Sequence, residues 1–125
     1  MNATEMARQA YHPARSFLRD GRSTEAQLFG QITSRLQAAA DSGFEGFARL
    51  AEALHENREL WSALAIDVAD DENTLPAPLR AQIFYLAEFT FLHTSKVLRK
   101  EADADVLIEI NRAVMRGLNR AEAAQ

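Results

Sequence analysis

The chain has 125 residues, of which 47% are hydrophobic and 26% are charged, a composition typical of one globular domain with a single modest core. Its formal net charge of -4 argues against a free-standing nucleic-acid binder, because phosphate contacts require an excess of lysine and arginine. The chain contains no cysteine, which excludes disulfides, thiol catalysis and cysteine metal sites.

The whole chain, residues 1–125, is predicted to form one all-α domain, a single bundle of about five helices. Only five glycines and three prolines interrupt it, and no stretch alternates β-branched with polar residues. A short first helix is expected at about 4–11, before Pro13. Residues of about 12–22 are expected to form a loop, which carries three arginines.

A second helix is predicted to begin at Ser23 or Thr24 and to end near Ala40. Gly43 follows it and is expected to adopt the left-handed conformation that commonly terminates helices. The apolar stripe of this helix consists of Leu28, Ile32, Leu36 and Ala39.

The third helix, from Phe44 to about Asp70, gives the clearest periodic signal. Seven residues alternate in spacing between three and four: Phe47, Leu50, Leu54, Asn57, Trp61, Leu64 and Val68. This is an unbroken heptad seam, and Trp61 is expected on its inner side. Asn57 has two interpretations. Either it caps a new helix at a break, or it is a buried amide that fixes the register of a partner helix.

The run DDENTLPAPLR separates the third helix from a fourth. Pro76 and Pro78 both fit a first helical turn, whose N–H groups have no partner within the helix. The fourth helix is predicted to extend to about Lys100, and a fifth from residue 103 or 105 to about Arg120. The inward stripe of the fifth helix is Leu107, Ile110, Val114 and Leu118.

The fourth helix has two apolar faces. Its core stripe is predicted to be Leu79, Ile83, Leu86, Ala87, Thr90, Thr94 and Val97. The stretch IFYLAEFTFL adds apolar residues outside that stripe, which are Tyr85, Phe89, Phe91 and Leu92. The helix is therefore either the wrapped centre of the bundle or the carrier of a partner-binding face formed by these four residues.

No arrangement of residues predicts catalysis or metal binding. The three histidines are far apart in sequence, and the single Glu-x-x-His pair, Glu52 and His55, is expected to be solvated. Nucleophile-elbow, phosphate-loop and zinc-protease motifs are absent from the sequence. We expect a non-enzymatic protein without a cofactor. Without a signal-peptide region or a long apolar run, we expect it to be cytoplasmic with no membrane partner.

Arg112, Arg116 and Arg120 recur at every fourth position of the fifth helix. With Lys96, Arg99 and Lys100 they would offer a basic patch to RNA or to an acidic partner. The alternative is a solvated polar face, which is favoured because acidic residues interleave with the basic ones and no aromatic stacking platform accompanies them. Direct RNA binding is therefore not expected.

Four segments in order, MARQAY, ALHENRELWSALAIDVAD, LPAPLRAQIFYLAEFT and IEINRAVMRGL, resemble the FlaF family of flagellar biosynthesis regulators of alphaproteobacteria. The resemblance covers nearly the whole chain. It implies a small, helical, non-enzymatic protein that acts in flagellin production and filament assembly. The family motif falls here on Asn57, Leu60, Trp61, Asp67, Leu75, Pro76, Leu79, Ile83, Tyr85, Leu86 and Phe89.

Flagellin is the partner that the resemblance implies, with the regulator FlbT as a further candidate and a second copy of the chain as another. Flagellin has amphipathic helical ends that stay unpaired until assembly, and a chaperone or secretion adaptor would shield them. The alternative function is post-transcriptional control of flagellin synthesis, acting on flagellin messenger RNA or together with FlbT.

Overall fold

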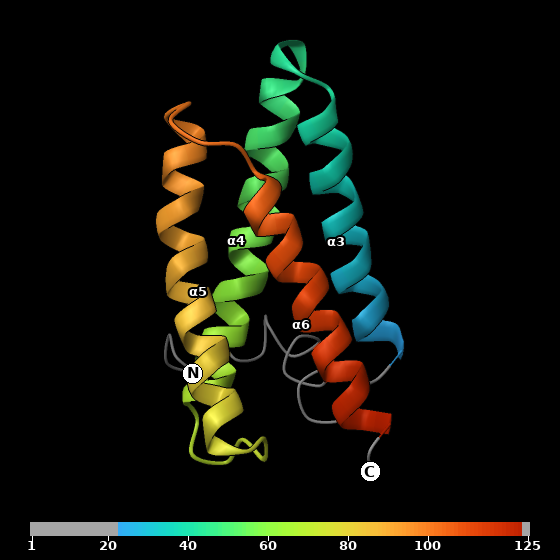
Figure 1. Cartoon of the computed structure of the whole chain (residues 1–125), viewed down its shortest axis with the longest axis vertical. Coiled ribbons are helices and arrows are strands. Elements are labelled where there is room, and N and C mark those ends of the chain that lie inside the picture. Colours follow the sequence, from blue (N-terminus) through green and yellow to red (C-terminus); the bar gives the residue numbers. More distant parts are fainter. Residues whose placement is uncertain (1–22, 124–125) are drawn as a thin grey trace, which may run out of the picture.

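A computed structural model describes residues 23–123, which form four packed α-helices and no strand within that range (Figure 1). The elements are α3 (Ser23–Asp41), the 3₁₀ turn η1 (Phe44–Gly46), α4 (Phe47–Ala69), α5 (Ala77–Leu98) and α6 (Asp105–Ala123). The all-α prediction is confirmed, and the count of about five helices is slightly high. The helix expected at 4–11 and the loop expected at 12–22 lie outside the described residues.

α3 and α4 form an antiparallel pair joined by a tight turn. Gly43 has a φ of 67°, so the predicted left-handed terminator is confirmed. η1 follows at once, with the Gly46 N–H donating to the Gly43 carbonyl at 3.0 Å. A Cβ on Gly46 would collide with the side chain of Ser42, so this turn requires glycine at both positions. The predicted start of the third helix at Phe44 is therefore a 3₁₀ turn, and the α-helix begins at Phe47.

α4 is one continuous helix of 23 residues, as the heptad spacing predicts. Asn57 lies in its middle and is fully buried, so the interpretation of Asn57 as the cap of a new helix is wrong. The same seam buries Leu54, Trp61, Leu64 and Val68. The buried-amide interpretation therefore holds.

The turn between α4 and α5 is built by short polar side chains. The Asp70 carboxylate accepts the Glu72 N–H at 2.9 Å, and the Asn73 side-chain oxygen accepts the Leu75 N–H at 3.0 Å. Such local bonds hold a chain in a turn conformation. Pro78 lies in the first turn of α5, as predicted, whereas Pro76 is the N-cap, one residue before the helix begins.

The core consists of two apolar clusters at different heights of the bundle. One is built around Trp61, with Phe29, Leu64, Ile83 and Val114. The other contains Leu36, Ala39, Ala53, Leu54, Val97, Ala104, Leu107 and Ile108. Along each helix, buried polar residues separate the two clusters: Thr33 on α3, Asn57 on α4, Thr90 and Thr94 on α5, and Asn111 on α6.

Hydrogen bonds join three helices within this polar layer. The Trp61 indole Nε1 donates to Asn111 Oδ1 at 2.8 Å. Asn111 Nδ2 donates to Asn57 Oδ1 at 2.8 Å and to Thr33 Oγ1 at 3.1 Å. Asn111 therefore links α6 to both α3 and α4, which fixes the register of the three helices.

The stripes of α3 and α6 differ from the sequence prediction. On α3, Phe29 is buried and Leu28 is only half-buried, because the helix faces α4 and α6 at once. On α6, Asn111 takes a central core position, whereas Ile110 is half-buried. The side chain of Leu118 lies outside the part of the structure that is described.

Candidate partner-binding face

α5 lies at the edge of the bundle, packed mainly against α4 and only thinly against α6 (Figure 1). Its inner face buries Ile83, Ala87, Thr90, Thr94 and Val97, which confirms most of the predicted core stripe. Leu79 and Leu86 of that stripe are half-buried. No described helix covers the outer face, so the interpretation of this helix as the wrapped centre of the bundle is wrong.

The four residues predicted to bind a partner differ in exposure. Tyr85 is 67% exposed and Leu92 is 62% exposed. Phe89 is half-buried, and its ring stacks on His93 with centroids 5.6 Å apart. Phe91 is half-buried and packs against the cluster around Trp61, so part of its area stabilises the fold. Tyr85, Leu92 and the free side of Phe89 thus form the accessible apolar surface of the set.

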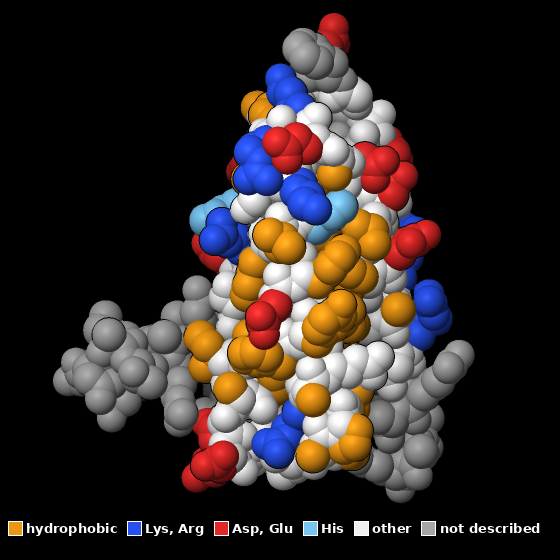
Figure 2. All heavy atoms as spheres, turned by 60° about the vertical axis from the view of Figure 1, so that its left-hand side comes forward, with side chains coloured by type: hydrophobic (Ala, Val, Ile, Leu, Met, Phe, Trp, Pro, Cys, Tyr) orange, Lys and Arg blue, Asp and Glu red, His pale blue; other side chains and the backbone are white. Residues whose placement is uncertain are grey.

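Hydrophobic side chains gather along the face that comes forward in Figure 2, with few charges among them. Phe84, 41% exposed, and Leu98, 40% exposed, widen this surface on the other flank of α5. Isolated exposed apolar residues are ordinary, whereas several on one helix face are typical of a contact surface. The apolar face of α5 is defined here by Tyr85, Phe89 and Leu92.

A shallow apolar groove runs beside this face, where the first half of α5 meets the second half of α6. Its volume is about 160 Å³, and its lining consists of Leu79, Gln82, Ile83, Leu86, Ala113, Val114 and Gly117. A Cβ on Gly117 would meet no atom within 4 Å, so this glycine leaves open space. The contribution of α6 could not be seen in the sequence, because it depends on how the two helices are placed.

A larger hollow of about 310 Å³ lies between α3 and α4. Charged residues form much of its rim, and Arg35 meets Glu56 across it at 2.8 Å. Both side chains of this pair are substantially exposed, so the pair contributes little to stability. An apolar helix seated there would take charged side chains out of water, so this hollow is less suited to such a ligand than the α5–α6 groove.

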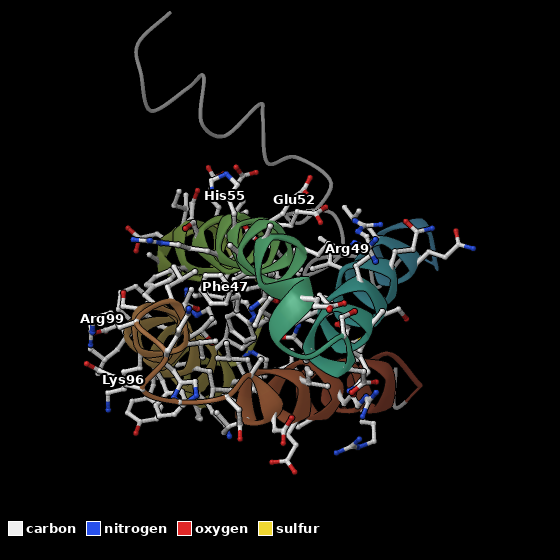
Figure 3. All side chains as sticks on the ribbon, turned by 90° about the horizontal axis from the view of Figure 1, so that it is seen from above. Phe47, Arg49, Glu52, His55, Lys96 and Arg99 are labelled. Carbon is white, nitrogen blue, oxygen red and sulfur yellow. The ribbon has the colours of Figure 1, made fainter. Side chains whose placement is uncertain are left out.

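The basic residues do not form one patch. Seen along the bundle axis, Lys96 and Arg99 lie on the outer side of α5, whereas Arg49 points out on the side of α3 (Figure 3). α6 begins at the end of the bundle at which α5 ends (Figure 1), and Arg112 of α6 donates to Gln37 Oε1 of α3 at 3.2 Å, so it is directed toward α3. Among the described residues, Arg112 therefore does not join Lys96 and Arg99 in one patch, and the side chain of Arg120 lies outside the described part.

The two described histidines, His55 and His93, lie in separate contacts. Glu52 and His55 are both exposed, as predicted, and His55 meets Glu59 at 2.6 Å. The His93 ring contacts the Asp103 carbonyl at 2.9 Å and so joins α5 to the following loop. Within residues 23–123 no cluster of three or more potential ligands could hold a metal ion. None of the helices in that range is long and apolar enough to cross a membrane.

Most of the family-motif positions are core or turn positions. Asn57, Leu60, Trp61, Asp67 and Ile83 are buried. The half-buried members are Leu75, Leu79, Leu86 and Phe89. Of the two exposed members, Pro76 begins α5 and Tyr85 lies on its outer face. Tyr85 is thus the exposed motif position that no turn or cap explains.

Taken together, the fold and this surface define a class: a small all-α bundle whose described helices leave one apolar helix face and an adjoining groove uncovered. The family model for the flagellar protein FlaF matches residues 7–118, and the chain belongs to this family. It is a family of flagellar proteins and not of enzymes. Searches of curated proteins and of solved structures gave no significant match.

Proposed function

We propose that this flagellar protein binds flagellin as a chaperone or secretion adaptor and so promotes flagellin production and filament assembly. An amphipathic helix of flagellin would lie along the apolar face of α5, with its apolar side chains entering the α5–α6 groove. The observation that carries the proposal is the exposure of Tyr85 and Leu92 on the same helix whose first half lines that groove.

Three features support a helical ligand here. The surface is long and narrow, following one helix, which is the shape that helix-in-groove recognition uses. Tyr85 and Phe89 are aromatic, and aromatic residues are enriched among the anchors of binding sites. The groove is lined mostly by apolar side chains, with Gln82 as its polar residue, so an apolar stripe would be desolvated there without leaving buried charges unpaired.

A calorimetric titration of purified protein with flagellin tests the proposal, run with and without RNase and at increasing salt. Apolar binding is expected to survive RNase and to change little with salt. Binding through several phosphates would weaken by orders of magnitude between roughly 50 and 200 mM salt. That second pattern would favour the alternative of control through flagellin messenger RNA. Binding that required FlbT would instead favour joint action with that regulator.

Gly117 gives a direct test of the groove. Gly117→Leu fills the open space and is expected to weaken flagellin binding, whereas the matched control Gly117→Ala is expected to bind nearly as the parent does. Neither change should harm folding, because a helical glycine costs about 1 kcal/mol relative to alanine. Unchanged binding by Gly117→Leu would remove the groove from the proposal.

A further inference from the structure

The outermost line of α5 carries both apolar and charged residues. Six exposed residues lie along it, spaced four, three, four, four and three apart: Ala81, Tyr85, Glu88, Leu92, Lys96 and Arg99. At 100° per residue this line lies opposite the buried stripe around Ile83 and Thr94. It therefore points away from the other described helices, on the side of the molecule that comes forward in Figure 2.

Two opposite charges on this line lie symmetrically about an apolar residue. Glu88 precedes Leu92 by four residues, and Lys96 follows it by four. Neither charge forms an ion pair within the described part of the chain. They are eight residues apart, about 12 Å along the helix, so they do not pair with each other. Each exposed charge is therefore available to an opposite charge on another molecule.

We propose that two copies of the chain associate through this outer face, with the two α5 helices antiparallel and crossing at Leu92. In this arrangement residues equally distant from Leu92 face each other across the two-fold axis. Glu88 of one copy then meets Lys96 of the second, and the same pair forms again on the other side. The two Leu92 side chains pack against each other at the axis.

The charge pattern selects the antiparallel direction. In a parallel pair Glu88 would face Glu88 and Lys96 would face Lys96, and like charges at a helix contact are destabilising. The antiparallel pair also places Tyr85 opposite Arg99, whose guanidinium already meets Glu101 at 3.2 Å. A guanidinium over a tyrosine ring adds a cation–π contact. One helix face per chain makes a small interface, so the dimer is weak and reversible.

This self-association does not depend on flagellin, since every residue it uses belongs to the chain itself. Where the flagellin proposal also holds, and only there, the two partners compete for Tyr85 and Leu92. The dimer then keeps the apolar face covered until flagellin arrives. The experiments below use the protein alone, so their failure leaves the flagellin proposal untouched.

The first experiment measures self-association of the full chain by sedimentation velocity over a wide concentration range. Glu88→Lys and Lys96→Glu are each expected to weaken the dimer about tenfold, because two attractive pairs become repulsive. Combining both changes restores the pairs in reversed order, so the double variant should dimerise within about threefold of the parent. Glu109→Lys on α6 is the matched charge-reversal control and should have no effect. A parent that stays monomeric, or a double variant no better than the singles, overturns the proposal.

The second experiment uses the absence of cysteine from the chain. At the crossing point, Leu92→Cys places the two cysteine Cα atoms within the roughly 7 Å that a disulfide allows. Under mild oxidation this variant should form a covalent dimer. Tyr85→Cys is the control. In the antiparallel pair its two thiols would lie about 20 Å apart, so this variant should form no covalent dimer. Cross-linking of both variants would indicate parallel pairing and contradict the proposal, as would cross-linking of neither.

Discussion

At the scale of single residues, Asn111 is the side chain on which the buried polar layer depends. It accepts from Trp61 and donates to both Asn57 and Thr33, so it satisfies groups on two other helices. Asn57 contributes less, because its Oδ1 takes one bond while its Nδ2 has no partner among the described residues. Replacing Asn111 therefore leaves more buried polar groups without a hydrogen-bond partner than replacing Asn57 does.

We predict that Asn111→Leu destabilises the protein more than Asn57→Leu does. Asn111→Leu leaves the Trp61 N–H and the Asn57 amide buried without partners, at about 1–3 kcal/mol for each such group. Asn57→Leu removes one hydrogen bond and also an unpartnered amide NH2 group, so stability should change by about 1 kcal/mol or less, with helix register less tightly specified. Urea melts of the two variants compare them, and an equal or reversed order would show that Asn111 does not centre the network.

Trp61 combines burial with one of those hydrogen bonds. Its side chain is fully buried, and its ring meets Phe29 edge-to-face with centroids 6.4 Å apart. Truncating a core tryptophan costs about 3–5 kcal/mol, and here Asn111 Oδ1 also loses its donor. We predict that Trp61→Ala is largely unfolded by circular dichroism, with Trp61→Phe intermediate. A folded Trp61→Ala protein that had only lost flagellin binding would place Trp61 at an interface instead.

At the scale of elements, the sequence predicted helices better than it predicted their contacts. α4 and the inner stripe of α5 followed from spacing alone, because heptad and helical periods are local properties. Asn111 was passed over because it is polar, although Leu107, Asn111 and Val114 have the spacing of a seam. A buried Asn57 needs a polar partner, and that requirement would have drawn attention to Asn111.

Of the candidate site, the sequence predicted the part on α5 but not the part on α6. Tyr85 and Leu92 fall outside the core stripe on a helical wheel, so their exposure follows from α5 alone. The groove beside them needs Ala113 and Gly117 of α6, about 30 residues later in the chain. Its existence depends on the splay between α5 and α6, which no local pattern encodes.

For the apolar face of α5 we predict that Phe89→Ser costs about 1 kcal/mol or less in stability, as at partly exposed sites. Phe89 is half-buried and stacks on His93, so some packing is lost but no core position is emptied. Flagellin binding should weaken by about 2 kcal/mol or more if Phe89 is an anchor. Denaturant melts and flagellin titrations on the same preparations measure both quantities.

Ile66→Ser provides the control for Phe89→Ser, because Ile66 is 41% exposed on α4 and lies outside the apolar face of α5. It should cost similar stability and leave flagellin binding unchanged. Global unfolding of Phe89→Ser would mean that Phe89 is a core residue. A stable variant that bound flagellin like the parent would remove Phe89 from the binding surface.

At the scale of the whole molecule, the two apolar clusters raise the question of whether the bundle unfolds as one unit. The cluster of Trp61 and the cluster of Leu54 are separate groups of buried side chains. The helices themselves pass through both clusters, and the hydrogen bonds of Asn111 tie α3, α4 and α6 together between them. Separating one cluster from the other would therefore break helices and expose buried polar groups at the same time.

We accordingly predict a single cooperative transition, as small domains generally show. Trp61 is the only tryptophan and lies in one cluster, so its fluorescence reports that cluster, whereas far-ultraviolet circular dichroism reports helix throughout the chain. The two probes should give coincident urea curves with the same midpoint and slope. Asn111→Leu removes the hydrogen bonds between the clusters. The cluster without Trp61 is built largely from alanine and leucine and holds no aromatic residue among its members, so we expect it to unfold first. In this variant the circular dichroism signal should therefore begin to fall before the fluorescence changes. Coincident curves in that variant would show that continuity of the helices, and not the polar layer, makes the bundle cooperative.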